Sequence, residues 1–362
     1  MSDDDHRRSI EDILEQMGTY VHDTHEDVST GNQHQKGNDA VRKIKEAYDM
    51  LPIWREDENL SLPDDRDPIK IPEMYEQCCD LVSKITYDSD DIETFCNEEL
   101  HRIDAGSPHC LNPATGLFIS ALINKEDIVG PITITNPPRS EYNRLGYRLG
   151  ETKEALLNLK GIKGNHICQK MKRGCAYLDG CSIYHLGSGM EGGEIVVSGG
   201  FYFSPGSDMK GGEIRIRKDP KDPVEHIGHV GTGMKAGKIV VEGDAMDPGY
   251  AMKGGYLTLK GDAIGVAGDL MEGGTLDIIG NVEEIIDCKE KATILVGGDA
   301  KRIYGRNFDG RVFVKGDVHE YVTYGEENPN LSVAGRIRNY SRGLPAAEDS
   351  LDKYRRMLLD KP

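Results

Sequence analysis

The chain has 362 residues, 43 of them glycine, with 6% aromatic residues and a formal net charge of −18. This length allows two domains, or one domain and a tail, and the composition argues against a conventional globular core built on large rings. Nucleic acid is excluded as an expected partner because phosphate binding needs clustered positive charge. A membrane is excluded as well, since the longest strongly apolar stretch, Leu117–Ile123, is too short to cross a bilayer.

The negative charge lies mainly in the first third of the chain. Residues 1–100 carry 27 acidic and 10 basic residues, whereas the remainder carries 35 and 34. Segments of this kind usually stay solvated, so residues 1–69 are predicted to form an acidic, largely disordered leader and linker. The alternative interpretation is a docking tail for a basic partner.

The start of the chain and its cysteines bear on the compartment. The sequence opens MSDDDHRR, without the apolar segment of a secretory signal. The eight cysteines are irregularly spaced, which favours a reduced intracellular protein over a disulfide framework. We therefore expect a cytoplasmic protein.

Helical patterns precede residue 106. Residues 39–50 have apolar side chains at helical spacing, and Pro72 suits the first turn of a helix that runs to about Ile85. A further helix is expected over Asp91–Arg102, with acidic residues in its first turn. Residues 106–150 contain a short apolar element and the strand-like ITIT. Residues 70–150 are thus predicted to form a small helical or α/β cap.

Residues 151–340 contain a repeat of 18–19 residues. Its strands close at ten positions, with one longer spacing of 25 residues: Gly161, Gly180, Gly199, Lys218, Gly243, Gly261, Gly280, Gly298, Gly316 and Gly335. The residues four and two positions before each closure are all apolar, and those between them are mostly polar. Period-two alternation at a fixed long period predicts a right-handed parallel β-helix of about ten coils.

A second marker precedes most strands of the repeat. An apolar residue, a charge and one or two glycines recur in the order M-x-G-G, at Met171, Met190, Met209, Met234, Met252 and Met271, with a shorter F-D-G at Phe308. We expect a buried methionine and a glycine corner with positive φ in each coil. An Asp or Asn follows several closing glycines, and there it is expected to bond its own backbone as a turn former.

A stack of such coils needs covered ends, because a terminal coil exposes apolar surface and strand edges. Residues 106–150 and the helical tail 346–359, within a tail domain of residues 341–362, are the predicted covers. The 25-residue coil between Lys218 and Gly243 is the predicted outward bulge of the ladder and the first place to look for a partner surface.

Three segments of the repeat resemble the GXGXG-type β-helix domain: GSGMEGGEIVVSG (187–199), GTGMKAGKIVVEGD (231–244) and GYAMKGGYLTLKGDAIGVAGDLMEGGTLDIIG (249–280). That domain forms the carboxy-terminal domain of the glutamate synthase large subunit and most of one subunit of formylmethanofuran dehydrogenase. The resemblance implies a non-catalytic scaffold that packs against the catalytic subunits of a redox complex. It implies protein partners and carries over no catalytic residue.

Several side chains could still carry chemistry. Metal ligation by Cys168, Cys175 and Cys181, with His166 and His185 nearby, is conceivable, but the spacing favours structural cysteines. A calcium site at the Asp series needs a nine-residue motif that the sequence lacks, so neither metal nor cofactor is expected. Outside the repeat, His109 and Cys110 are the candidate catalytic residues, with His101, Asn112 and Arg139 near them in the sequence.

Three hypotheses for function follow. The first is a scaffold or subunit of a multi-component redox enzyme, either formylmethanofuran dehydrogenase-like or glutamate synthase-like. The second is a stand-alone enzyme with a site in the cap region around His109 and Cys110. The third is a self-associating structural protein, because an uncovered β-helix end offers unpaired strand edges.

Overall fold

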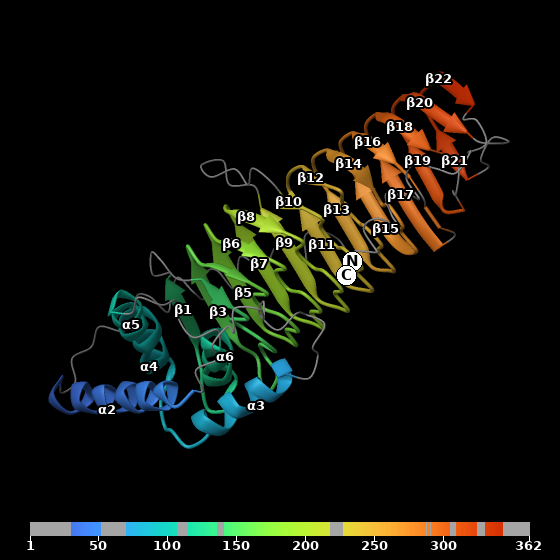
Figure 1. Ribbon diagram of the computed structural model, residues 1–362. Helices are drawn as coiled ribbons and strands as arrows, with labels where there is room; N and C mark the ends of the chain where they lie inside the picture. The colour runs from blue at the N-terminus through green and yellow to red at the C-terminus, as the bar shows by residue number, and fades with distance from the viewer. Residues whose placement is uncertain are drawn as a thin grey trace.

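The computed structural model describes residues 30–51, 70–106, 114–135, 141–217, 227–286, 288–289, 291–304, 309–323 and 330–342. A helical region comes first and a long β-solenoid follows it, with the helices gathered at the β1 end of the solenoid (Figure 1). The helices are α2 (Thr30–Asp49), α3 (Lys70–Val82), α4 (Ser89–Thr94), the π-helical turn η1 (Phe95–Glu99), α5 (Leu100–Gly106) and α6 (Thr115–Asn124).

The solenoid consists of two 11-stranded parallel sheets, to which successive strands of the chain contribute alternately. The first sheet contains β1 (Pro131–Thr135), β3 (Leu156–Lys160), β5 (Cys175–Asp179), β7 (Glu194–Ser198), β9 (Glu213–Arg217), β11 (Lys238–Val241), β13 (Tyr256–Leu259), β15 (Gly273–Ile278), β17 (Lys291–Val296), β19 (Arg311–Val314) and β21 (Leu331–Val333). The second contains β2 (Tyr142–Asn143), β4 (Lys163–Asn165), β6 (Ser182–Tyr184), β8 (Phe201–Phe203), β10 (Ile227–Gly228), β12 (Ala245–Met246), β14 (Ala263–Ala267), β16 (Val282–Ile285), β18 (Ala300–Tyr304), β20 (Val318–Thr323) and β22 (Ile337–Arg342). The predicted parallel β-helix is confirmed.

The core follows the period-two pattern of the repeat. The predicted inward residues are buried in every coil from Leu157 to Val314, and each pairs with its equivalent in the next coil, as Leu257 pairs with Leu276. Each buried aliphatic side chain contributes roughly 1.5–3 kcal/mol. Stacking therefore supplies the stability that a single coil lacks.

The six repeat methionines form a second buried column. Met171, Met190, Met209, Met234, Met252 and Met271 are all fully buried. The methyl carbons of the first five of these methionines each lie against the glycine that precedes the first-sheet strand of the next coil, where they occupy the space that a side chain on that glycine would need. A Cβ on Gly193, for example, would lie 2.7 Å from Met171 Cε. The predicted buried methionine is confirmed for these coils, whereas Phe308 lies outside the described residues.

The corner between the second and first sheets has an unusual backbone. In successive coils three alternate residues have positive φ, as at Arg144, Gly146 and Arg148, and again at His166, Cys168 and Lys170. Glycine enters this region at little steric cost. The physical reason for glycine at alternate positions of this repeat is therefore the local backbone.

The Asp and Asn residues after the closing glycines correct one expectation. They do not bond their own backbone. Instead, the side-chain Oδ1 of each accepts the backbone N–H of the equivalent residue in the next coil, at 2.7–2.9 Å. The acceptors are Asp244, Asp262, Asn281, Asp299 and Asp317, and the corresponding donors are the N–H groups of Asp262, Asn281, Asp299, Asp317 and Arg336. The coils lie one strand spacing apart, which lets a short side chain reach its neighbour. These residues form what we call the Asp/Asn ladder.

The stack of coils begins before residue 151, the predicted start of the β-helix. Strand β1 pairs with β3, with Ile132 beside Leu157, and Ile132 is buried like the inward residues of the repeat. The 25-residue offset between paired residues and the lack of a closing glycine hid this rung from a 19-residue pattern. A second 25-residue offset, between β9 and β11, matches the predicted longer coil, although its residues 218–226 are outside the described ranges.

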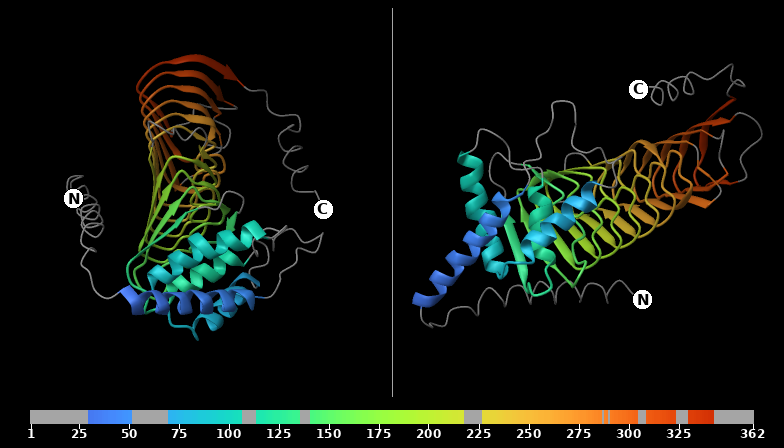
Figure 2. Two further views of the ribbon diagram at one scale, coloured as in Figure 1. Left: turned by 90° about the vertical axis from the view of Figure 1, so that its left-hand side faces the viewer. Right: turned by 60° about the horizontal axis from the view of Figure 1, so that its bottom comes forward.

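Helix α6 covers the first rung (Figure 2). All ten of its residues are buried. Gly116 lies so close to β2 that a Cβ there would be 1.9 Å from the carbonyl oxygen of Asn143. The other expected helices correspond to α2, which begins at Thr30, to α3, and to the continuous run from α4 to α5. The predicted tail helix 346–359 lies outside the described residues.

Candidate functional site

The candidate catalytic residues His109 and Cys110 lie outside the residues that the structure describes, as do Asn112 and Arg139. The assignment of Cys110 as nucleophile and His109 as base therefore stays a prediction. His101 lies in α5, and helix α6 begins at Thr115, shortly after His109 and Cys110 in the sequence.

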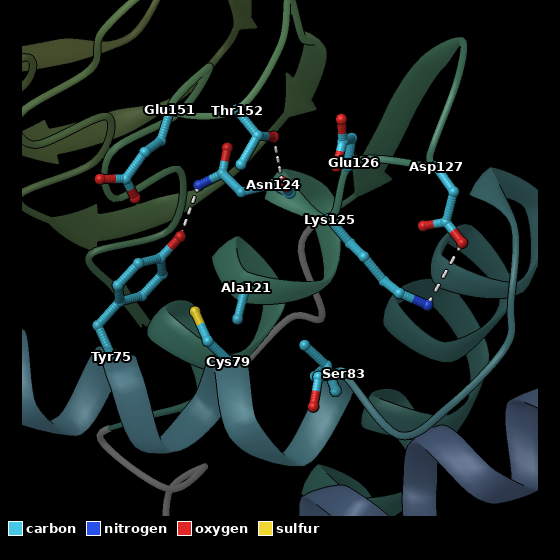
Figure 3. Close-up of a pocket in the computed structure, with 11 residues that line it drawn as sticks. Tyr75, Cys79, Ser83, Ala121, Asn124, Lys125, Glu126, Asp127, Glu151 and Thr152 are labelled. Carbon is cyan, nitrogen blue, oxygen red and sulfur yellow. Dashed lines mark hydrogen bonds and ion pairs between the residues drawn. The ribbon is translucent and has the colours of Figure 1, made fainter.

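A cavity of about 600 Å³ lies between helix α3, helix α6 and the first full coil of the solenoid (Figure 3). Its wall combines apolar surface with a thiol, a phenol, one lysine and three carboxylates. The lining residues are Tyr75, Cys79, Val82, Ser83, Ala121, Asn124, Lys125, Glu126, Asp127, Glu151 and Thr152. Sequence patterns gave no sign of this cavity because its members come from three separate elements.

Asn124 organises the polar side of the cavity. Its Nδ2 donates to Tyr75 Oη at 2.8 Å and to the carbonyl oxygens of Tyr147 and Arg148, both at 3.2 Å. Its Oδ1 accepts the backbone N–H of Gly150 at 3.0 Å. The hydroxyl of Thr152 donates to the Asn124 carbonyl oxygen at 2.5 Å. This network ties α3 and α6 to the first corner of the solenoid, so much of the polar wall is structural.

The thiol and the lysine of the cavity are both restrained. Burial raises the pKa of Cys79 to about 11, so the thiol is protonated at neutral pH. Lys125 Nζ donates to the Ile85 carbonyl oxygen at 2.6 Å, lies 3.4 Å from Asp127 Oδ2, and sits 4.6 Å from the centre of the Tyr87 ring. Among the described residues that line the cavity, no histidine stands beside Cys79 as a base.

The cysteines of the repeat lie mainly in the solenoid interior. Cys168 and Cys181 are buried and Cys175 is partly buried. Burial raises the pKa of Cys168 to about 12, which disfavours the thiolate that a metal requires. The rings of His166 and His185 stack with centroids 4.9 Å apart. Within the described ranges no group of three or more His, Cys, Asp or Glu side chains could hold a metal ion.

The outer face of the second sheet carries a different feature, a partly exposed apolar column. Tyr184, Phe203, Gly228, Met246 and Ile264 pair in register across five consecutive strands of that sheet, β6 to β14. Tyr184 is 49% exposed, and Met246 and Ile264 are each 43% exposed. At about 4.8 Å per strand the column is about 19 Å long. We call Tyr184, Phe201, Phe203, Met246 and Ile264 the apolar strip.

The aromatic end of the apolar strip is packed. The ring centre of Tyr184 lies 5.7 Å from that of Phe201 and 5.9 Å from that of Phe203. The Phe203 ring covers Gly228, and a Cβ on that glycine would lie 2.8 Å from Phe203 Cδ2. His229 contacts the same ring edge to face, with centroids 4.9 Å apart. The strip is thus an ordered surface, because its rings fix one another.

The apolar strip ends where the face becomes charged. Beyond Ile264 the outward side chains include Glu283 and Lys301, 3.5 Å apart, and then His319, 3.6 Å from Asp299. The first sheet also presents ions on its outer face, where Arg215 lies between Glu194 and Glu213. Among the described residues of the second sheet, the apolar column extends over strands β6 to β14.

Comparisons with protein-family models, with curated proteins and with solved structures found no match for this chain. No helix among the described residues is long and apolar enough to span a membrane. The seven described cysteines form no disulfide among themselves. The β-solenoid, the cavity and the apolar strip are the features on which a functional argument can rest.

Proposed function

We propose that this protein is a non-catalytic β-solenoid scaffold that binds a protein partner through the apolar strip. The strip is the observation that carries the proposal. Exposed, contiguous apolar surface with ordered aromatic side chains is typical of protein–protein interfaces, where Tyr and Phe serve as anchors. Tyr184 and Phe203 stand at neighbouring positions of β6 and β8, and Met246 extends the same column.

The solenoid suits such a role physically. Each outward residue of the strip stands on a backbone that is bonded to the coils before and after it, as in β6, which pairs with both β4 and β8. A surface fixed in this way loses little conformational entropy when a partner binds. Aromatic residues with few rotatable bonds add contact area at the same low entropic cost.

The class of partner follows from the sequence resemblance. The GXGXG-type repeat implies catalytic subunits of a redox complex, of the formylmethanofuran dehydrogenase or glutamate synthase kind. The corner with three alternating positive-φ residues supports the resemblance, because it gives a physical reason for the glycine pattern. A cytoplasmic complex of this scaffold with an oxidoreductase is therefore the finer form of the proposal.

Affinity purification of the tagged full-length chain from its native host tests the proposal. The informative variant carries Tyr184→Ser and Met246→Ser. The matched control carries Tyr256→Ser and Phe313→Ser, which remove large side chains that are 64% and 43% exposed on the first sheet. We expect the wild type and the control to retain one stoichiometric partner, identified by mass spectrometry, and the strip variant to lose it.

Two results would count against the proposal at different levels. Retention of the partner by the strip variant would remove the apolar strip as the interface. A partner without oxidoreductase activity in the purified complex would leave a scaffold but refute the redox assignment. A chain that purifies alone would contradict both.

A further inference from the structure

Three carboxylates border one end of the apolar strip. Asp244 immediately precedes strand β12 and Asp247 immediately follows it, so they stand on either side of the exposed Met246. Asp262 is the equivalent of Asp244 in the next coil and precedes β14, which carries Ile264. Asp244 is exposed, and Asp247 and Asp262 are half-buried. We call these three residues the acidic rim.

The fold holds each carboxylate of the acidic rim through one oxygen atom. Asp244 Oδ1 accepts the Asp262 N–H, and Asp262 Oδ1 accepts the Asn281 N–H, both at 2.7 Å. Asp247 Oδ1 accepts the Val266 N–H at 2.8 Å. These bonds fix the side chains and leave the second oxygen, Oδ2, for an outside donor, because a carboxylate can accept at both oxygens.

The acidic rim keeps its negative charge. Lys260 precedes Asp262 by two residues, but its ion pair is with Glu242, at 2.9 Å. His229 Nε2 lies 4.0 Å from Asp247 Oδ2. Within the part of the chain that the structure describes, no lysine or arginine pairs with the rim. A partner with basic side chains would therefore find complementary charge here, whereas an acidic surface would be repelled.

The aromatic end of the strip has a different border. In the β6 coil the positions equivalent to the rim hold Ser182 and His185, on either side of Tyr184. The exposed apolar residues thus run along the solenoid axis from a border of Ser and His to a border of carboxylates (Figure 1). This asymmetry favours one direction for a bound segment.

The spacing of the strip favours a helix as that segment. Its residues recur once per coil, about 4.8 Å apart. An amphipathic helix presents its apolar face once per turn, about every 5.4 Å. An extended strand presents side chains on one face about every 6.7 Å, which matches less well. About 13 helical residues span the strip of about 19 Å.

We propose that the apolar strip and the acidic rim together bind an amphipathic helix of the partner protein, with basic residues at the end that lies over Met246 and Ile264. The apolar face of the helix contacts Tyr184, Phe203 and Met246, and its Lys or Arg side chains donate to Oδ2 of the acidic rim. This inference rests on the proposed function, in which the strip is the interface, and adds the chemistry and direction of the bound segment.

Fluorescence anisotropy of labelled synthetic peptides with the full-length chain tests this inference. Two amphipathic peptides of about 13 residues share leucines at i, i+3, i+4 and i+7, and carry either lysine or glutamate at their polar positions. The informative variant is Asp244→Asn with Asp247→Asn. It removes two charges and keeps the Oδ1 acceptors, as Asn281 does in the Asp/Asn ladder. The control, Asp277→Asn with Asp299→Asn, removes the same charge away from the strip.

We expect the wild type and the control to bind the lysine peptide at least about tenfold more tightly than the glutamate peptide, because only the former complements the acidic rim. The informative variant should lose most of this preference. The variant with Tyr184→Ser and Met246→Ser should bind neither peptide, since it lacks the apolar anchors.

Equal affinity of the wild type for the two peptides, or binding of neither, would overturn the inference. An equal loss of preference in the informative variant and the control would overturn it too, because the general negative charge of the chain would then explain the preference. Dimers of the wild type in sedimentation velocity that the Tyr184→Ser, Met246→Ser variant lacks would make a second copy the occupant. In each case, loss of the native partner by that variant in the affinity purification would still support the strip as the interface.

Discussion

Asn124 at the end of α6 accepts the backbone N–H of Gly150 through its Oδ1 atom, at 3.0 Å. Its Nδ2 atom bonds two further backbone carbonyls of the same corner. One buried side chain therefore satisfies three backbone groups that the first rung would otherwise leave unpaired. The stability of the amino-terminal end of the solenoid depends on this residue, since a buried polar group without a partner is costly.

Replacement of Asn124 with Ala is expected to lower the free energy of unfolding by about 3 kcal/mol or more, because each orphaned buried group costs about 1–3 kcal/mol. Asn97→Ala is the matched control. Asn97 also joins a helical turn to a strand, through Thr133 and Thr135, but at a partly exposed position. Its replacement should cost about 1 kcal/mol. Urea unfolding of the two variants measures the difference, and equal losses would contradict the capping role.

Replacement of Leu259 with Asp buries an unpaired charge, since Leu259 is fully buried. We expect a loss of more than about 4 kcal/mol, or failure to fold. The outward neighbour Thr258 pairs with Asp277 of the next coil, so Asp at this position would meet a like charge. Thr258→Lys is therefore the control, and thermal melts should show it near the wild type. Equal melting of both variants would contradict the inward register.

Gly180 and Gly280 both close a strand, but for different physical reasons. Gly180 has a φ of +57° and open space around its missing Cβ, whereas a Cβ on Gly280 would lie 2.2 Å from Asp262 Oδ1. Asn adopts the left-handed region more readily than Ala. At position 180 we therefore expect Asn to destabilise less than Ala. At position 280 we expect Asn to destabilise more than Ala, because either side chain would collide with Asp262 Oδ1 and Asn is the larger of the two. Denaturant midpoints of the four variants decide the point.

Acid should weaken the carboxy-terminal end of the Asp/Asn ladder. The Arg336 N–H, and next the Arg338 guanidinium, hold the pKa of Asp317 below its ordinary value of 3.8. A carboxyl whose folded pKa is depressed stabilises the fold above its unfolded pKa and loses this contribution as the pH falls through the folded pKa. We expect Asp317→Asn to be less stable than the wild type at pH 7, and the difference to shrink below about pH 4. Melts from pH 7 to pH 2 would show this convergence, and a difference that stays constant with pH would contradict it.

The Cys79 thiol in the cavity between α3 and α6 should react slowly with alkylating reagents. Burial raises the pKa of Cys79 to about 11, so little thiolate exists at pH 8. We expect Cys79 to react with iodoacetamide at least about tenfold more slowly than free cysteine, because the thiolate is the reactive form. Mass spectrometry of the modified peptide measures the rate. A faster reaction than that of free cysteine would contradict this expectation and make Cys79 a candidate nucleophile.

The repeat in the sequence was sufficient to predict the solenoid, because the same local chemistry recurs in every coil. Buried apolar residues stand at alternate positions in each coil, for example Ile195 and Val197 in one coil and Ile294 and Val296 in another. Stacking the coils in register buries all of these inward residues together. The buried methionines followed from the same repetition. Each of these features depends on residues within one coil and on its copies, so a single sequence contains the whole signal.

Features that depend on contacts between different elements could not be predicted from the repeat and became visible in the three-dimensional arrangement. The β1 rung departs from the 19-residue period, and the cavity joins Tyr75, Asn124 and Glu151 from three elements. The Asp/Asn ladder bonds the next coil, a distance that no local turn pattern encodes. The apolar strip arises because Tyr184 and Met246, which lie three coils apart, stand in one column once the strands are in register.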